Sequence, residues 1–345
     1  MGYDAAARAG GRMDQAQRVG VIGAGAVGSY YGARLAEAGH DVRFLLRRDY
    51  EAVRSGGLRV RSVDGDLHLA RPFAAATSEE IGPVDWVVCA LKATSLDAVP
   101  ALLQPCLQET TRVLVLMNGL GLEERFSDWF GARRVFGALA FTCINRGEPG
   151  VVNHLRYGPI TIGHAEDDPA ELSAAARLWA GAKVEVSTAP SLLRARWEKL
   201  CWNIPFNGLT IAAGGVATDR VVGDAALRRE ARALMEEVVR LGNAELARSG
   251  EAARIDGEAV IERMFAMTDV MGAYRPSTLI DYLEGRALEV EAIFGEPLRR
   301  AHALGEPAPR LELMTALLRS LAGGPGPAAT TGAGTAGDGS GGDAA

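Results

Sequence analysis

One segment near the amino terminus constrains the fold more than any other. Residues 18–23 read as a short apolar strand that runs into Gly23, Gly25 and Gly28, which have the spacing G-x-G-x-x-G, and helical spacing follows. The first glycine permits a tight turn, the second lets a pyrophosphate approach the backbone, and the third allows close helix–strand contact. The segment therefore predicts dinucleotide binding, the alternative being a glycine-rich packing turn. The predicted contacts are Gly23, Ala24, Gly25, Ala26, Val27 and Gly28.

Strand-like and helix-like segments continue to alternate as far as about residue 188. This alternation predicts an α/β domain over residues 18–188, with a mostly parallel sheet covered on both faces. The further predicted strands are 41–47, 86–91, 112–118 and 134–141, the predicted helices are 27–38 and 95–107, and 151–165 is expected as an antiparallel addition.

The character of the chain changes after Pro190, where helical spacing dominates. A helical second domain over residues 189–321 is the simplest interpretation. Its predicted helices are 192–209, 224–249, 258–271 and 288–304. The lead-in 1–17 and the glycine-rich tail 322–345 lack the apolar residues needed to offset the entropy of ordering, so we expect both to be disordered.

Composition excludes several classes of protein. The formal net charge is −6, whereas nucleic-acid binding normally needs a basic face. No apolar run is long enough for a membrane helix, and neither membrane nor nucleic acid is an expected partner. The 4 cysteines and 5 histidines are scattered without metal-ligand spacing, so we expect no metal and a reducing cytoplasm.

The end of the second predicted strand bears on the choice of dinucleotide. NAD-binding sites place an acid there for the ribose 2′-hydroxyl, but this chain has Arg47 and Arg48. A guanidinium can hold a 2′-phosphate through charge-assisted hydrogen bonds. We therefore predict NADP as cofactor, with Arg47 as the principal contact; the alternative is a solvated loop arginine.

Two further strand ends point to the same edge of the sheet, where ligands bind in folds of this kind. Lys92 follows the strand 86–91 and could neutralise cofactor charge. Asn118 closes the strand 112–118 and could bond the nicotinamide ribose or the substrate. The alternatives are a solvated lysine and an Asn-Gly turn.

The helical half carries polar residues at regular spacing among apolar ones. Lys199, Asn203 and Asn207 are spaced i, i+4, i+8 and would form one stripe on a helix. A polar ligand would satisfy these groups, although a solvated helix face explains the spacing too. Pro205 lies between the asparagines, and we expect a kink there.

A second polar group lies further along the chain. Ser277 precedes a short helical pattern, where a serine is a natural N-cap and could also bind a carboxylate. Glu289 is expected in the first turns of the next helix, where an acid also favours the helix dipole.

With these motifs in view, the chain resembles the ketopantoate reductase family (2-dehydropantoate 2-reductase) from about residue 18 to residue 321. The shared motifs, in order, are VIGAGAVG, LLR, LKA, NGLG, WEKLxxNxxxN and PSxLxDxxxGRxxExExxxG. The resemblance implies a Rossmann domain followed by an all-helical domain, with the active site in the cleft between them.

The resemblance also implies roles for individual residues. Lys199 would be the general acid, and Glu289 would assist it. Asn203, Asn207 and Ser277 would hold the substrate, with Asn118 between substrate and cofactor and Lys92 near the cofactor.

The implied activity is NADPH-dependent reduction of ketopantoate to pantoate for pantothenate and coenzyme A synthesis. Two alternatives stay open: a paralogous reductase of another 2-oxo acid, and a non-catalytic NADP-sensing protein. Whether the chain forms a homodimer is also left open.

Overall fold

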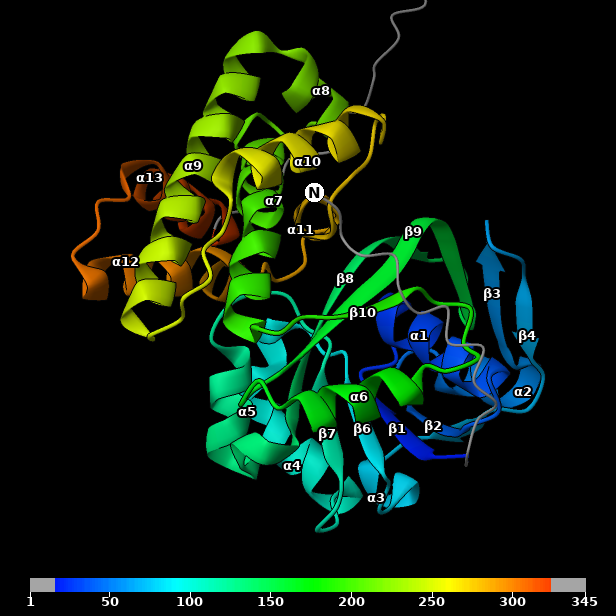
Figure 1. Cartoon of the computed structure of the whole chain (residues 1–345). Helices are drawn as coiled ribbons and strands as arrows, with labels where there is room; N and C mark the ends of the chain where they lie inside the picture. Colours follow the sequence, from blue (N-terminus) through cyan, green and yellow to red (C-terminus); the bar gives the residue numbers. More distant parts are fainter. Residues whose placement is uncertain (1–15, 324–345) are drawn as a thin grey trace, which may run out of the picture.

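The computed structural model describes residues 16–323, so most of the two predicted disordered ends lies outside the described residues. A large sheet with its helices forms one half of the molecule, and a group of helices forms the other half (Figure 1). The predicted fold class, an α/β sheet domain followed by a helical domain, is confirmed.

The sheet has ten strands in the order β4-β3-β9-β8-β7-β6-β1-β2-β5, with β10 paired to β9. The strands are β1 (Arg18–Ile22), β2 (Asp41–Leu45), β3 (Leu58–Ser62), β4 (Leu67–Leu69), β5 (Phe73–Ala75), β6 (Trp86–Cys89), β7 (Arg112–Val115), β8 (Val135–Arg146), β9 (Val151–His164) and β10 (Val186–Thr188). The neighbours β7-β6-β1-β2 run parallel, which brings their carboxyl ends to one edge.

Two features of the sheet differ from the prediction. Residues 151–164 form a single long strand, β9, that pairs antiparallel with an equally extended β8. The strands β3, β4 and β5 were not predicted, because each has only three to five residues and therefore carries little pattern.

Helices cover both faces of the sheet. They are α1 (Ala26–Glu37), α2 (Tyr50–Gly56), α3 (Ser78–Ile81), η1 (Ala93–Ala98), α4 (Val99–Leu103), η2 (Gln104–Cys106), α5 (Leu122–Phe130), η3 (Ala132–Arg134) and α6 (Pro169–Leu178). Side chains of α1 and α6 share one apolar core, and those of α3, α4 and α5 share another. The predicted helix 95–107 is three short helices, η1, α4 and η2, interrupted near Pro100 and Pro105.

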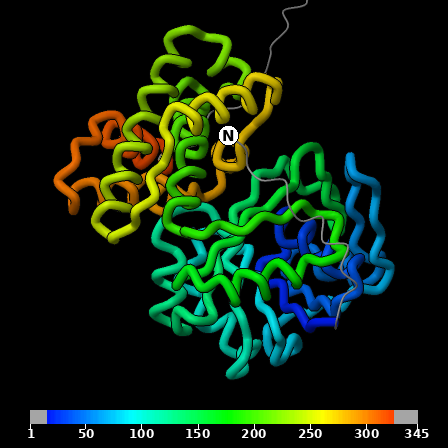
Figure 2. The backbone as a smooth tube through the Cα atoms, in the orientation of Figure 1, coloured from blue at the N-terminus to red at the C-terminus, as the bar shows by residue number. Residues whose placement is uncertain are grey.

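The second half contains α7 (Leu192–Ala212), α8 (Thr218–Gly223), α9 (Ala225–Arg248), α10 (Gly257–Asp269), α11 (Ser277–Leu283), η4 (Glu291–Gly295), α12 (Glu296–Leu304) and α13 (Pro309–Ala322). The helix α7 is central, packing on α9, α10, α11 and α13, as the tube in Figure 2 also shows. It continues through Pro205 without interruption, and sixteen of its residues, from Leu192 to Ile211, are buried.

Glycines allow α7 to approach both the sheet and its helical neighbours. A Cβ on Gly163 of β9 would lie 2.8 Å from the Cβ of Leu192, so the start of α7 rests directly on the sheet. A Cβ on Gly208 would lie 2.8 Å from the sulfur of Met314, so α13 rests on the far end of α7. These close approaches fix α7 between the sheet and the remaining helices.

Candidate functional site

The turn between β1 and α1 has the geometry that anion binding requires. Gly23 has a φ of +91°, and a Cβ on it would lie 2.7 Å from the backbone nitrogen of Leu91. A Cβ on Gly28 would lie 2.4 Å from the carbonyl oxygen of Gly23. Gly25 occupies the N-cap of α1 without a side-chain cap, and the first turn holds no acid. The free peptide N–H groups of α1 therefore fit a dinucleotide phosphate.

The loop after β2 lies next to this turn. Arg47 and Arg48 are both exposed, and Arg48 approaches Asp49 at 3.8 Å. A third arginine, Arg146 at the end of β8, approaches Asp49 from the other side at 3.5 Å. The sequence reasoning missed Arg146, because nothing in its local pattern shows that the β8–β9 hairpin reaches the β2 loop.

The polar stripe of α7 meets the sheet at Lys199. This residue is 6% exposed, and its ammonium nitrogen donates a hydrogen bond to Oδ1 of Asn118 at 2.9 Å. The same nitrogen lies 5.9 Å from the ring centre of Phe141. Two residues predicted from separate halves of the sequence are thus in direct contact.

Asn118 is held in place from the helical side as well. The next residue, Gly119, has a φ of +120°, and a Cβ on it would lie 2.6 Å from the Cβ of Ala292. The Leu120 N–H donates to the carbonyl of Ala292 at 3.0 Å. The loop after β7 is therefore clamped between α7 and η4.

A buried ion pair lies one turn before Lys199 on α7, and the sequence reasoning did not identify it. Nε of Arg196 lies 3.0 Å from Oε1 of Glu123, and both side chains are almost fully buried. Arg196 also donates to the carbonyl of Met117 at 2.8 Å. It therefore fixes the residue next to Asn118 relative to α7.

The surroundings of Lys199 favour its neutral form. Burial lowers the pKa of Lys199 to about 7, and the positive charge of Arg196 contributes in the same direction. The charges of Glu289 and Glu123 oppose this shift. An amine whose pKa lies near neutrality can both donate and accept a proton under ordinary conditions.

Glu289 is 6% exposed, and its Oε1 accepts the Ala93 N–H at 2.8 Å. Burial raises the pKa of Glu289, while this N–H and the charge of Lys92 act against the rise. The expectation that Glu289 lies within a helix is wrong. It directly precedes Val290, the N-cap of the π-helical turn η4, and its carbonyl accepts the Ile293 N–H at 3.2 Å.

Lys92 is not a free cation. Its ammonium pairs with Asp281 of α11, which also accepts a hydrogen bond from Nε of Arg286 at 2.8 Å. The side chain of Asp281 is 2% exposed, whereas that of Lys92 is 44% exposed. This contact joins the end of β6 to the helical half, an arrangement that the strand pattern alone did not reveal.

Besides Asn118, the predicted substrate-binding residues lie on α7 and α11. Asn203 and Asn207 are buried, and Oδ1 of Asn207 has no hydrogen-bond partner among the described residues. Ser277 is exposed at the start of α11. The expectation that Ser277 caps this helix is wrong, since Pro276 is the N-cap and no side-chain cap is formed.

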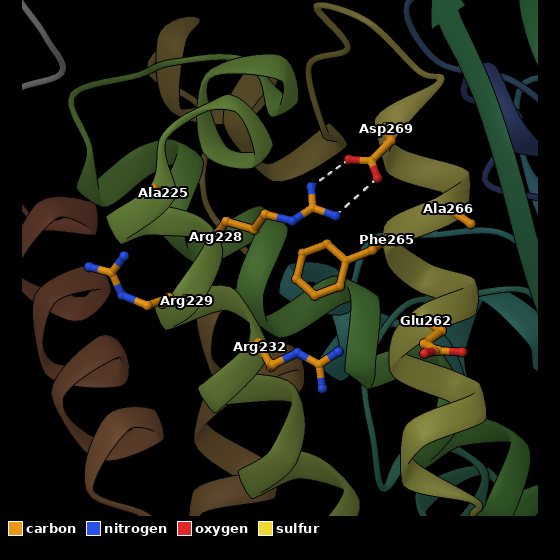
Figure 3. A pocket seen from close by; sticks show the side chains of 8 residues that line it. All are labelled: Ala225, Arg228, Arg229, Arg232, Glu262, Phe265, Ala266 and Asp269. Atoms are coloured by element: carbon orange, nitrogen blue, oxygen red, sulfur yellow. Dashed lines mark hydrogen bonds and ion pairs between the residues drawn. The ribbon is translucent and has the colours of Figure 1, made fainter.

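One hollow lies beside Glu289, and another lies elsewhere in the helical half. The first, of about 920 Å³, is lined from both halves, with Ala93 and Leu120 on the sheet side. The other, of about 520 Å³, lies between α9 and α10 away from Lys199 (Figure 3). There Arg228 pairs with Asp269 at 2.6 Å and stacks on Phe265, so this arginine ties two helices together.

Within residues 16–323, no helix has the length and apolar character needed to cross a bilayer.

Comparison with known proteins agrees with this arrangement. The family described as "Ketopantoate reductase PanE/ApbA" matches residues 19–167, and its C-terminal counterpart matches residues 191–322. A 2-dehydropantoate 2-reductase from Nostoc sp. is 37% identical over 313 residues, which cover 89% of this chain and 96% of that protein. The chain belongs to the ketopantoate reductase family. It is accordingly a pyridine-nucleotide-dependent oxidoreductase acting on a CH–OH group.

Solved structures show the same relationship. The 2-dehydropantoate 2-reductase from Geobacter metallireducens GS-15 is 42% identical, with a TM-score of 0.84, and the match covers 88% of this chain and 99% of that one. The enzyme from Methylococcus capsulatus is 28% identical, with a TM-score of 0.78 and coverage of 88% and 96%. D-mandelate dehydrogenase shares the fold at 19% identity, with a TM-score of 0.79 and coverage of 88% and 98%.

Proposed function

We propose that this ketopantoate reductase family member reduces 2-dehydropantoate to pantoate with NADPH, for pantothenate and coenzyme A synthesis. The observation that best supports this proposal is the buried ammonium of Lys199. Asn118 holds it at the edge of the sheet where the glycine turn between β1 and α1 also lies. When bound, the dinucleotide supplies the hydride for the 2-keto carbon. The chain itself has to supply the proton and the electrostatic stabilisation.

Lys199 has the properties of the proton donor. Reduction of a ketone leaves charge on its oxygen, and a nearby cation with a transferable proton stabilises that charge. A pKa of about 7 makes the ammonium acidic enough to give up its proton, while the charge of Glu289 helps to keep it protonated before transfer. Asn118 orients the donor by accepting one of its three N–H groups.

Asn203, Asn207 and Ser277 are proposed to hold the substrate. The unpartnered Oδ1 of Asn207 supports this role, because an unsatisfied buried oxygen costs about 1–3 kcal/mol and a substrate hydroxyl would satisfy it. The exposed hydroxyl of Ser277 and the free N–H groups at the start of α11 are available to a carboxylate.

NADP is proposed as the cofactor because the loop after β2 presents Arg47 and Arg48 where an NAD site carries an acid. The exposed Arg47 side chain can donate hydrogen bonds to a 2′-phosphate. Gly23, Gly25 and Gly28, with the backbone of Ala24, Ala26 and Val27, are proposed to hold the remainder of the dinucleotide.

Steady-state NADPH oxidation tests the proposal. The purified chain is assayed with 2-dehydropantoate and with a panel of other 2-oxo acids, each with NADPH and with NADH. We expect the highest kcat/KM for 2-dehydropantoate with NADPH. A higher value for another 2-oxo acid would identify the paralogous reductase, and binding of NADPH without any turnover would identify the sensor.

A further inference from the structure

Arg146 ends the long strand β8 and reaches across the edge of the sheet to the glycine turn. Its Nη2 lies 3.6 Å from the position that a Cβ would take on Gly25, and its Nε lies 4.0 Å from the same point. Its Nη1 lies 3.5 Å from Oδ2 of Asp49, in the loop after β2. The guanidinium thus spans the gap between the two loops.

The space beside Gly25 is where a dinucleotide pyrophosphate approaches the backbone in folds of this kind. Gly25 precedes α1, whose first turn has no side-chain cap and no acid. Positive potential from the helix start and from the Arg146 guanidinium therefore falls on the same space.

Asp49 accounts for the orientation of Arg146 and for the need for it. Its side chain is 15% exposed, and Arg146 bridges it to the glycine turn. Without Arg146 the carboxylate would repel a phosphate bound there. The ion pair engages one Nη of the guanidinium and leaves Nη2 and Nε facing the turn. These donors match the paired oxygens of a phosphate group.

We propose that Arg146 binds the pyrophosphate of the dinucleotide and offsets the charge of Asp49. This inference rests on the proposed function, since it requires a dinucleotide at this turn. It gives the two arginines different roles. Arg47 binds the 2′-phosphate, which NADPH has and NADH lacks, whereas Arg146 binds the pyrophosphate, which both dinucleotides have.

Equilibrium binding to the full chain tests the assignment without any turnover. Dissociation constants for NADPH, NADH and adenosine 2′,5′-bisphosphate, which lacks a pyrophosphate, are measured by titration calorimetry for the wild type and for Arg146→Gln. We expect at least about a tenfold weakening for both dinucleotides and a smaller effect for the bisphosphate. Arg146→Lys should recover part of the lost affinity, because lysine restores the positive charge but not the paired N–H donors of the guanidinium.

Two further variants exclude a structural explanation. Arg54→Gln removes an exposed arginine of α2 that pairs with the nearby Glu51 at 3.2 Å, and it should leave all three constants unchanged. Asp49→Asn breaks the same ion pair but should bind both dinucleotides as tightly as the wild type or more tightly. A weakening by Asp49→Asn equal to that of Arg146→Gln would overturn the proposal.

Other results overturn it as well. An unchanged affinity of Arg146→Gln for both dinucleotides removes the contact, and a loss confined to NADPH assigns Arg146 to the 2′-phosphate instead. Wild-type protein that binds neither dinucleotide contradicts the proposed function. Wild-type binding with an unaffected Arg146→Gln variant contradicts only this inference.

Discussion

The ammonium nitrogen of Lys199 lies 2.9 Å from the side-chain oxygen of Asn118, and this hydrogen bond joins α7 to the loop after β7. It is partly buried, and it connects the helical half to the edge of the sheet where the glycine turn also lies. A proton donor held in this way needs little reorganisation before transfer.

The first prediction concerns pH. Since the pKa of Lys199 is lowered to about 7, kcat/KM for ketone reduction should fall as the pH rises through that value, because the donor loses its proton. The reverse oxidation needs the neutral amine and should rise through the same value. Initial rates in both directions, measured across the neutral range, check this. Parallel profiles in the two directions would contradict the assignment.

The second prediction concerns Glu289. Its negative charge raises the pKa of Lys199, so Glu289→Gln should move the break in the kcat/KM profile to lower pH and reduce turnover at neutral pH. Glutamine can still accept the Ala93 N–H, so the loop before η4 should keep its conformation. An unaltered profile would show that the two groups are not coupled.

The third prediction concerns the buried Arg196–Glu123 pair. Arg196→Met leaves the Glu123 carboxylate buried without its partner, which should destabilise the fold by about 3–5 kcal/mol. Removing the guanidinium should also raise the pKa of Lys199 and move the break in the rate profile to higher pH. Denaturant unfolding and the pH dependence of kcat/KM measure the two effects.

A paired variant serves as the control for this change. Arg196→Met combined with Glu123→Leu removes both charges and should recover much of the lost stability. It should still turn over slowly, because Met117 loses the hydrogen bond that fixes the Asn118 loop. Full activity in the double variant would leave the pair with a purely structural role.

The fourth prediction concerns Lys92 and Asp281. Lys92→Met should cost little stability, because Asp281 keeps its bond to Arg286 at 2.8 Å. If Lys92 turns toward the cofactor on binding, the variant should bind NADPH more weakly while its thermal unfolding without cofactor stays unchanged. If Lys92→Met lowered the unfolding temperature equally with and without NADPH, the role of Lys92 would be limited to its contact with Asp281 in the helical half.

The fifth prediction concerns cofactor choice. Arg47→Ala should lower kcat/KM with NADPH by roughly thirtyfold, or about 2 kcal/mol, and should leave the value with NADH nearly unchanged. Steady-state assays with both cofactors measure the ratio. A preserved NADPH preference would remove Arg47 from this role.

Local patterns in the sequence were sufficient to predict which residues lie at the edge of the sheet and which form the polar stripe of α7. Parallel strands bring their ends together, and a spacing of four residues fixes one helix face, so the place of Asn118 after its strand and the shared face of Lys199, Asn203 and Asn207 were predictable. The hydrogen bond between Lys199 and Asn118 was not. The glycine turn was also predictable, since its strand, turn and helix are contiguous.

Contacts between remote segments were not predictable. Nothing in the local sequence marks Asp281 as a partner of Lys92, yet it pairs with that lysine across the two halves. Arg196 and Arg146 gave no local signal. The partner of Arg196 lies 73 residues away on α5, and the partner of Arg146 lies in the loop after β2. Glu289 was placed in a helix because the apolar spacing around it continues, whereas η4 begins only after it.

The most direct test of the account is the effect of Lys199→Ala on hydride transfer from NADPH to 2-dehydropantoate. Lys183→Ala, which changes an exposed lysine paired with Glu37, is the matched control and should react like the wild type. The account predicts a kcat at least about a hundredfold lower for Lys199→Ala, with NADPH affinity retained. A normal kcat with only a raised KM would contradict it.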